Sequence, residues 1–263
     1  MNRRLKIRFN QHRNFLFSLL VFGILCNAQS SVSAGPPFIT DDPEPVEFHH
    51  WEFYISSIYN HDSSGSSGTL PHIEVNYGAA PNLQIHILAP LAFAQAPGGS
   101  LQYGTGEVEM GVKFRFQQET SRRPMMGIFP LLEIPTGDAN RGLSSSAVQS
   151  FLPVWIQKSW GSWTSYGGGG YWINPGDGNT NYWQFGALVQ KDISKYLTLG
   201  SELFYTTPAT TGASSRLILN IGGQYNFDEG HHLLFSAGHA LYGDTDLIGY
   251  LGFQWTFGPH DKK

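Results

Sequence analysis

Large apolar residues alternate with polar residues along most of the chain, most clearly in residues 107–116. The even positions of this stretch are all large and apolar: Val108, Met110, Val112, Phe114 and Phe116. The odd positions are charged or glycine: Glu107, Glu109, Gly111, Lys113 and Arg115. A two-residue period places these sets on opposite faces of a β-strand. One face therefore needs an apolar environment, and the other needs water or opposite charges.

The same alternation predicts twelve strands, most of them close to the ~9–11 residues that a tilted transmembrane strand needs. Their ranges are 47–60, 69–78, 83–93, 105–118, 125–135, 148–158, 163–173, 182–191, 196–206, 215–227, 232–242 and 247–257. The sequence therefore predicts an all-β fold, a single antiparallel up-and-down transmembrane β-barrel.

The connections support this interpretation because long and short ones alternate, as external loops and periplasmic turns do in outer-membrane barrels. The long ones are 61–68, 94–104, 136–147, 174–181 and 207–214, and the short ones are 79–82, 119–124, 159–162, 192–195 and 228–231. The last loop, 243–246, is short for its side. A secreted β-sandwich is the alternative, since its strands also alternate.

The first 34 residues have the composition of a cleavable signal peptide. A basic start precedes a short apolar stretch at 15–26, and Val32-Ser33-Ala34 fits a cleavage site. The mature chain then begins at Gly35 and contains no cysteine, because Cys26 is the only one. Lipidation at Cys26 is the alternative, which Leu25 disfavours because lipoprotein cleavage prefers a small residue there.

The predicted organisation is a signal peptide at 1–34, a periplasmic lead-in segment at 35–46, the barrel at 47–257 and a periplasmic tail at 258–263. The lead-in contains Asp41-Asp42-Pro43-Glu44-Pro45, whose prolines exclude a regular helix or central strand. Such a segment either stays rigid in the periplasm or folds into the barrel mouth. Calcium binding by its carboxylates is a further alternative.

Charge and histidine spacing exclude several functions. The chain has 16 basic and 20 acidic residues, and five basic residues lie in the signal peptide, so the mature balance is 11 − 20 = −9. Nucleic-acid binding needs a basic surface and is not expected. The pairs His49-His50 and His231-His232 are adjacent, so their side chains diverge in a strand. We therefore predict no metal and no cofactor, because metal ligands must converge.

Inward-facing positions carry the candidate functional residues. The lumen-lining set is Glu52, Glu74, His86, Glu107, Glu109, Lys113, Arg115, Glu133, Glu202 and Gln224. We expect Lys113 and Arg115 to pair with acids on neighbouring strands, because uncompensated charges in a confined space are costly. This network either ties the wall together or creates a field that favours cations and polar neutral solutes over anions.

Bulky inward positions also bear on the lumen: Phe129, Phe151, Trp155, Trp172, Phe204, Tyr242 and Tyr250. They either fill a narrow lumen or form an apolar site for an aromatic solute, because a twelve-strand barrel lies between small filled barrels and wide porins. The outward set is expected to contact outer-membrane lipid: Val108, Met110, Val112, Phe114, Phe116, Trp255 and Phe257.

The end of the last predicted strand, from Tyr250 to Phe257, resembles the C-terminal assembly signal of outer-membrane proteins. This resemblance implies that the barrel-assembly machinery is a partner, although Gly258 to Lys263 follow the signal here. A lipid hydrolase would need a Ser/His pair, but Ser236 has the opposite parity to His239, and Ser201 lies two strands away. No enzyme activity is therefore predicted.

The start of the mature chain, Gly35-Pro36-Pro37 followed by FITDDPEP and HHWEFY, resembles a bacterial family labelled putative MetA-pathway of phenol degradation or transporter. The resemblance implies an integral outer-membrane barrel, in a Gram-negative-type envelope, that passes or binds small and often aromatic compounds. The predicted function is thus a porin-like channel for passive transport. The alternatives are a closed structural or adhesion barrel and an outer-membrane lipid hydrolase.

Overall fold

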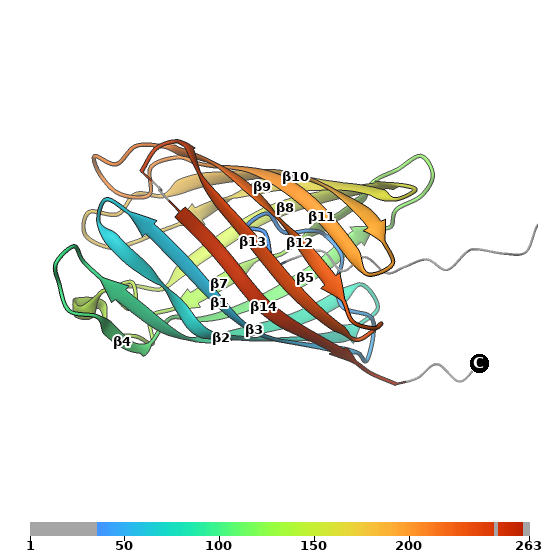
Figure 1. Ribbon diagram of the computed structural model, residues 1–263, viewed down its shortest axis with the longest axis horizontal. Coiled ribbons are helices and arrows are strands. Elements are labelled where there is room, and N and C mark those ends of the chain that lie inside the picture. The colour runs from blue at the N-terminus through green and yellow to red at the C-terminus, as the bar shows by residue number, and fades with distance from the viewer. Residues whose placement is uncertain (1–35, 245–246, 260–263) are drawn as a thin grey trace, which may run out of the picture. The chain divides into compact units, whose positions relative to one another are not determined.

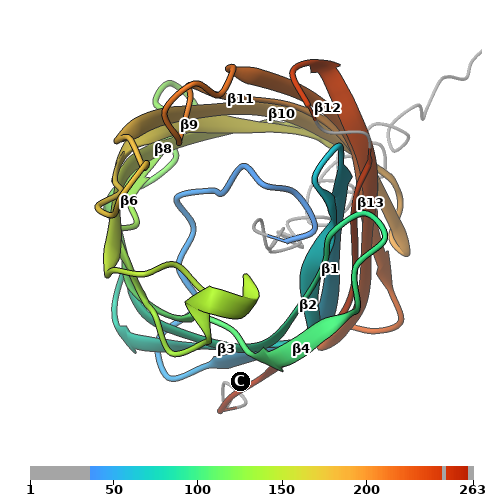
Figure 2. The same ribbon diagram turned by 90° about the vertical axis from the view of Figure 1, so that its left-hand side faces the viewer.

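The computed structural model describes residues 36–244 and 247–259, which form a closed antiparallel β-barrel (Figures 1 and 2). The strands are β1 (Trp51–Asp62), β2 (Gly65–Ala80), β3 (Leu83–Gln95), β4 (Gln102–Thr105), β5 (Val108–Gln117), β6 (Met125–Ile128), β7 (Leu131–Ile134), β8 (Gln149–Trp160), β9 (Trp163–Ile173), β10 (Tyr182–Ser194), β11 (Leu197–Thr206), β12 (Arg216–Asn226), β13 (His231–Tyr242) and β14 (Leu247–Phe257). The last strand closes the ring on the first, with Phe257 opposite Trp51. The predicted barrel is confirmed.

Two of the twelve predicted strands are each divided into two segments. β4 and β5 follow one another along the chain and both pair with β3, so they share one position in the wall. In the same way, β6 and β7 both pair with β5 and with β8. Pro130 separates β6 from β7 because proline has no N–H to give to the sheet. The predictions of continuous strands at 105–118 and 125–135 are corrected, while the wall keeps twelve strand positions.

The predicted long loop at 61–68 is a tight hairpin instead. β1 and β2 stay paired as far as Asp62 opposite Gly65, so that only Ser63 and Ser64 form the turn. The Asp62 carboxylate accepts a hydrogen bond from the Ser64 amide at 2.8 Å, which is a bond that stabilises turns. The connections at 135–148, 174–181 and 207–215 are long, as expected, and the first contains the 3-10 helix η1 (Ala139–Arg141).

The outer surface of the barrel is apolar. On β5, Met110, Val112, Phe114 and Phe116 are exposed, whereas Lys113 between them is buried. Exposed aromatic rings also contact one another along the barrel end that carries the short turns: Tyr196, Tyr225, Phe227, Phe253, Trp255 and Phe257. An apolar surface of this extent needs an apolar surrounding. No helix in the described ranges is long and apolar enough to cross a membrane.

Residues 36–46, here named the lumenal segment, run inside the ring of strands (Figure 2). The chain then continues through Phe48, which bridges to Gly78 at the end of β2, and enters β1 at Trp51. The sequence left open whether this proline-rich stretch stays outside the barrel or folds into it. Its position inside the barrel makes it part of the candidate site.

Candidate functional site in the barrel lumen

A buried carboxylate on β11 holds the first half of the lumenal segment. Glu202 is fully buried and accepts hydrogen bonds from the backbone amides of Ile39 (3.2 Å) and Thr40. The Asn220 side-chain amide donates to the same carboxylate at 3.1 Å. On β13, the Ser236 hydroxyl donates to the Pro37 carbonyl at 2.6 Å. Wall residues that the sequence places inward therefore satisfy the backbone of an irregular segment, which has no ladder partner of its own.

Ion pairs hold the second half of the segment. The Lys113 ammonium lies 2.9 Å from the Asp41 carboxylate and 3.7 Å from that of Asp42, and Arg115 lies 3.7 Å from Glu44. We expected both bases to pair with acids on neighbouring strands, and this expectation is wrong. Their acidic partners come from the lumenal segment, whose composition offered the signal: a run of acids with no base beside it.

These carboxylates are buried to different extents, since Asp42 is fully buried whereas Asp41 and Glu44 are partly exposed. Burial raises the pKa of the Asp42 carboxyl well above its usual range, although the Lys113 ammonium opposes the shift. Burial also raises the pKa of Glu44, against the opposing charge of Arg115. Loss of water thus outweighs the ion pairs at both positions, which is typical of charges enclosed on several sides.

A second polar network ties β2, β3, β5 and β7 together. The His86 ring lies 2.8 Å from the Glu109 carboxylate and 3.5 Å from that of Glu74. Glu133 is opposite Glu109 in the register, and the Glu107 carboxylate accepts a hydrogen bond from the Ser145 amide at 2.8 Å. Among the described residues, no group of three His, Cys, Asp or Glu side chains is arranged to hold a metal ion.

The remaining predicted lumen residues lie on the inner face as well. The Glu52 carboxylate accepts a hydrogen bond from the Tyr54 hydroxyl at 2.8 Å, and the Gln224 amide donates to Asn226 at 2.6 Å. All ten predicted lumen positions are buried or partly buried in the barrel. The seven positions predicted to face outward are exposed, apart from Val108, which is half-buried.

The bulky inward side chains fill one side of the lumen. Phe129, Phe151, Trp155 and Trp172 form one buried cluster, and Tyr182 stacks on Trp172 with ring centroids 5.9 Å apart. Tyr242 does not belong to this set, because its side chain is 60% exposed. The register explains the difference: Ala240 is opposite Ile218 and Tyr242 is opposite Leu217, so Leu241 is an extra residue that reverses the alternation.

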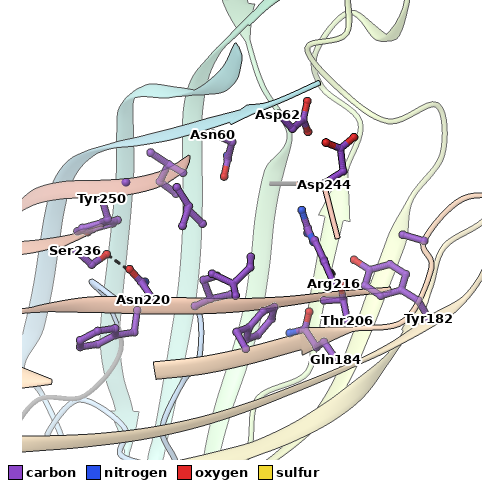
Figure 3. Close-up of a pocket in the computed structure, with 18 of the residues that line it drawn as sticks. Asn60, Asp62, Tyr182, Gln184, Thr206, Arg216, Asn220, Ser236, Asp244 and Tyr250 are labelled. Carbon is purple, nitrogen blue, oxygen red and sulfur yellow. Dashed lines mark hydrogen bonds between the residues drawn. The ribbon is translucent and has the colours of Figure 1, made fainter. Parts of the chain in front are cut away.

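The other side of the lumen contains a cavity of about 830 Å³ (Figure 3). Pro36 to Ile39 of the lumenal segment and Phe204, Ile218 and Tyr250 of the wall give it an apolar part. Polar side chains line the part nearer the long connections: Asn60, Asp62, Tyr182, Gln184, Thr206, Arg216 and Asp244. Sequence reasoning missed this grouping, because its members come from β1, β10, β11, β12 and the 243–246 connection.

The structure separates the residues that a lipid hydrolase would need to bring together. Ser236 is buried on the inner face of β13 and donates to the lumenal segment, whereas His239 is exposed on the same strand and contacts the Ala240 carbonyl. Ser201 lies on β11, opposite Val189 and Ile221 rather than beside His239. The described residues therefore give no Ser/His pair at these positions.

Comparison with known proteins supports the architecture. No family model and no curated protein matches the chain. Among solved structures, the chain is similar to an outer membrane channel from Pseudomonas putida F1, with 14% identity over 82% of this chain and 98% of that chain and a TM-score of 0.64. It is also similar to the NanC porin, with 8% identity, coverage of 79% and 100% and a TM-score of 0.54.

A third similar structure is the KdgM porin in complex with disordered oligogalacturonate, with 12% identity, coverage of 79% and 99% and a TM-score of 0.53. At these identities the likeness establishes the fold alone, a closed antiparallel β-barrel. The resemblance to the MetA-pathway family of phenol degradation is not confirmed.

Proposed function

We propose that the protein is an integral outer-membrane channel for the passive movement of small solutes. The observation that carries this proposal is a closed barrel with an apolar outer surface, a polar inner face and a cavity of about 830 Å³ inside it. A closed barrel satisfies its backbone without water, so it can lie in lipid. The band of exposed rings at the short-turn end matches the aromatic girdles that form at membrane interfaces.

The charges of the lumen favour cations and polar neutral solutes over anions. In the described part of the chain, the basic side chains on the inner face include Lys113, Arg115, Arg216 and His86, which lies against Glu74 and Glu109. More carboxylates lie on the same side: Asp41, Asp42, Glu44, Glu52, Glu74, Glu107, Glu109, Glu133 and Glu202. An excess of one charge in a narrow pore selects against ions of that sign.

The cavity favours solutes that combine an apolar body with polar groups. Phe38, Phe204 and Ile218 offer apolar contact, while Gln184 and Arg216 offer hydrogen bonds nearer the long connections. Small pockets of this mixed type bind compact ligands, with the polar groups fixing orientation. We include small aromatic compounds among the solutes for this reason, and the sequence resemblance to a phenol-linked family points the same way.

Conductance in planar bilayers tests the channel proposal. We expect the purified protein to give discrete current steps with a reversal potential that reports cation preference, and to admit neutral monocyclic compounds into loaded liposomes. The absence of both ion current and solute flux would instead favour the second candidate, a closed structural or adhesion barrel. The aromatic cluster around Trp155 and Trp172 motivates that alternative, because it fills part of the lumen.

A further inference from the structure

Glycines in the barrel wall leave the space that the lumenal segment occupies. At Gly186 on β10, an added Cβ atom would lie 2.8 Å from the Cβ atom of Thr40 and in conflict with its hydroxyl. At Gly127 on β6 it would lie 3.0 Å from the Pro43 Cβ atom, and at Gly200 on β11 it would lie 3.2 Å from the Phe38 ring. Side chains at these positions would occupy the space that the segment fills, since interiors leave no spare volume for a methyl group.

Polar contacts on three sides keep the segment in this position. Glu202 binds its backbone from β11, Ser236 binds the Pro37 carbonyl from β13, and Lys113 binds its carboxylates from β5. The Val46 amide also donates to the Gln84 side chain on β3 at 2.9 Å. Each contact joins the segment to a different part of the wall, so the segment crosses the lumen instead of following one strand.

The segment also borders the cavity. Pro36, Pro37, Phe38 and Ile39 line it together with the polar side chains labelled in Figure 3. A solute that passes from this cavity toward the short turns must pass the segment. The wall alone would leave a wider path, because barrels of about twelve strands exceed the size that wall side chains fill by themselves.

We infer that the lumenal segment sets the size limit of the channel, and that Gly186 is a specificity-determining position because it provides the space in which Thr40 docks. This inference rests on the proposed transport function. Residues 36–46 limit the size of the solute, and Gly186 provides the space in which they pack. The rest of the wall acts as a scaffold that holds the segment.

A single substitution tests it. Gly186→Val should displace Thr40 and raise single-channel conductance by roughly two-fold or more, with admission of larger neutral solutes into liposomes. The matched control is Ala187→Val, which adds a side chain of the same kind to the exposed face of the same strand and should conduct like the wild type. Circular dichroism in detergent checks that both variants are folded barrels.

A second variant covers the case in which Gly186→Val fails to fold. The triple substitution Asp41→Asn, Asp42→Asn and Glu44→Gln leaves every strand unchanged and removes the ion pairs to Lys113 and Arg115. It should increase conductance and solute size in the same direction. An independent check of docking is a Thr40→Cys/Gly186→Cys pair, whose Cβ atoms lie 2.8 Å apart on the present backbone and reach the ~3.8 Å of a disulfide once the segment moves away by about 1 Å.

The outcomes separate the two proposals. If the wild type conducts, and the folded Gly186→Val and triple variants keep its conductance and its size limit, the inference is wrong. The proposed channel function is unaffected by that result. Current from the variants but not from the wild type supports the inference and shows that the segment blocks the resting barrel. No current from any of these proteins overturns both proposals.

Discussion

At the scale of the residue, the lumen is organised around carboxylates that are buried for different reasons. Glu202 is enclosed by hydrogen-bond donors, two of which are backbone amides of the lumenal segment. Asp42 is fully buried beside the acidic Asp41 and Glu44, and its main compensating charge is Lys113. The first carboxylate satisfies a backbone that would otherwise lack partners, whereas the second carries a net cost of burial.

The cost at Asp42 predicts an unusual dependence of stability on pH. Because burial raises the pKa of Asp42 in the folded protein, its contribution to stability is present below the unfolded pKa of about 4 and is lost as the pH rises through the folded pKa. We therefore expect the Tm of the wild type, relative to that of Asp42→Asn, to be higher at about pH 5 than at about pH 7. Thermal unfolding followed by circular dichroism measures this difference.

Asp228 in the turn before β13 provides the control for this experiment. The Gly230 amide and the His231 side chain lower the pKa of its exposed carboxyl, so its contribution is lost only when the pH falls through a value below the usual range. The Tm difference between the wild type and Asp228→Asn should not change between the same two pH values. A difference for Asp42→Asn that stays constant or shrinks on acidification would contradict the assignment.

At the scale of the element, the strands differ in how strictly they follow the alternating pattern. β5 is unbroken from Val108 to Gln117, with a register shift against β6 between Arg115 and Gln117, whereas Pro130 breaks its neighbour next to the buried Phe129. β13 reverses its parity at Leu241, so that Tyr242 points away from the lumen. The extra residue in β13 moves Tyr242 from its predicted side, whereas Phe129 keeps the inward position that the alternation predicts, and both irregularities come from local backbone features that periodicity does not register.

The closing strand β14 carries a prediction about assembly. Phe257 lies opposite Trp51 and is exposed, so its loss removes little packing inside the barrel. If the end of this strand is the signal for the barrel-assembly machinery, Phe257→Ala should reduce the amount of inserted barrel in the outer-membrane fraction. Phe253→Ala, on the same outer face, should reduce it less. Equal losses in both variants would count against an assembly signal that ends on Phe257.

At the scale of the whole molecule, the balance of charge inside the barrel depends on the lumenal segment. Lys113 and Arg115 belong to the wall, and the carboxylates that neutralise them belong to residues 41–44. Replacing both bases with Gln leaves these carboxylates without a counter-charge in a confined space. We expect the cation preference of the channel to increase, as measured by the reversal potential in a salt gradient.

Lys158→Gln is the matched control for that measurement. Lys158 pairs with Glu119 at the short-turn end of the barrel and lies over the exposed Trp160 ring, away from the lumen. Its replacement should leave the reversal potential unchanged. If the Lys113→Gln/Arg115→Gln variant also keeps the wild-type value, these two residues do not contribute to the field along the path of the ions.

The alternating sequence by itself determined the barrel and the sidedness of its wall. Glu109, Lys113 and Glu202 face inward as parity requires, because side-chain direction along a strand depends only on position in the chain. The same rule misplaced Tyr242, where an extra residue shifts the parity, and composition mistook the serine-rich turn of the β1–β2 hairpin for a long loop.

Only the tertiary structure decided what the inward residues contact. Lys113 pairs with Asp41, which is 72 residues away in the chain, and Ser236 binds Pro37 across 199 residues. No period or motif records such pairs, because they depend on how the closed ring encloses an irregular segment. The sequence therefore determined a wall with a polar interior, and the closure of that wall around residues 36–46 decided which charges are neutralised and where the lumen is narrowed.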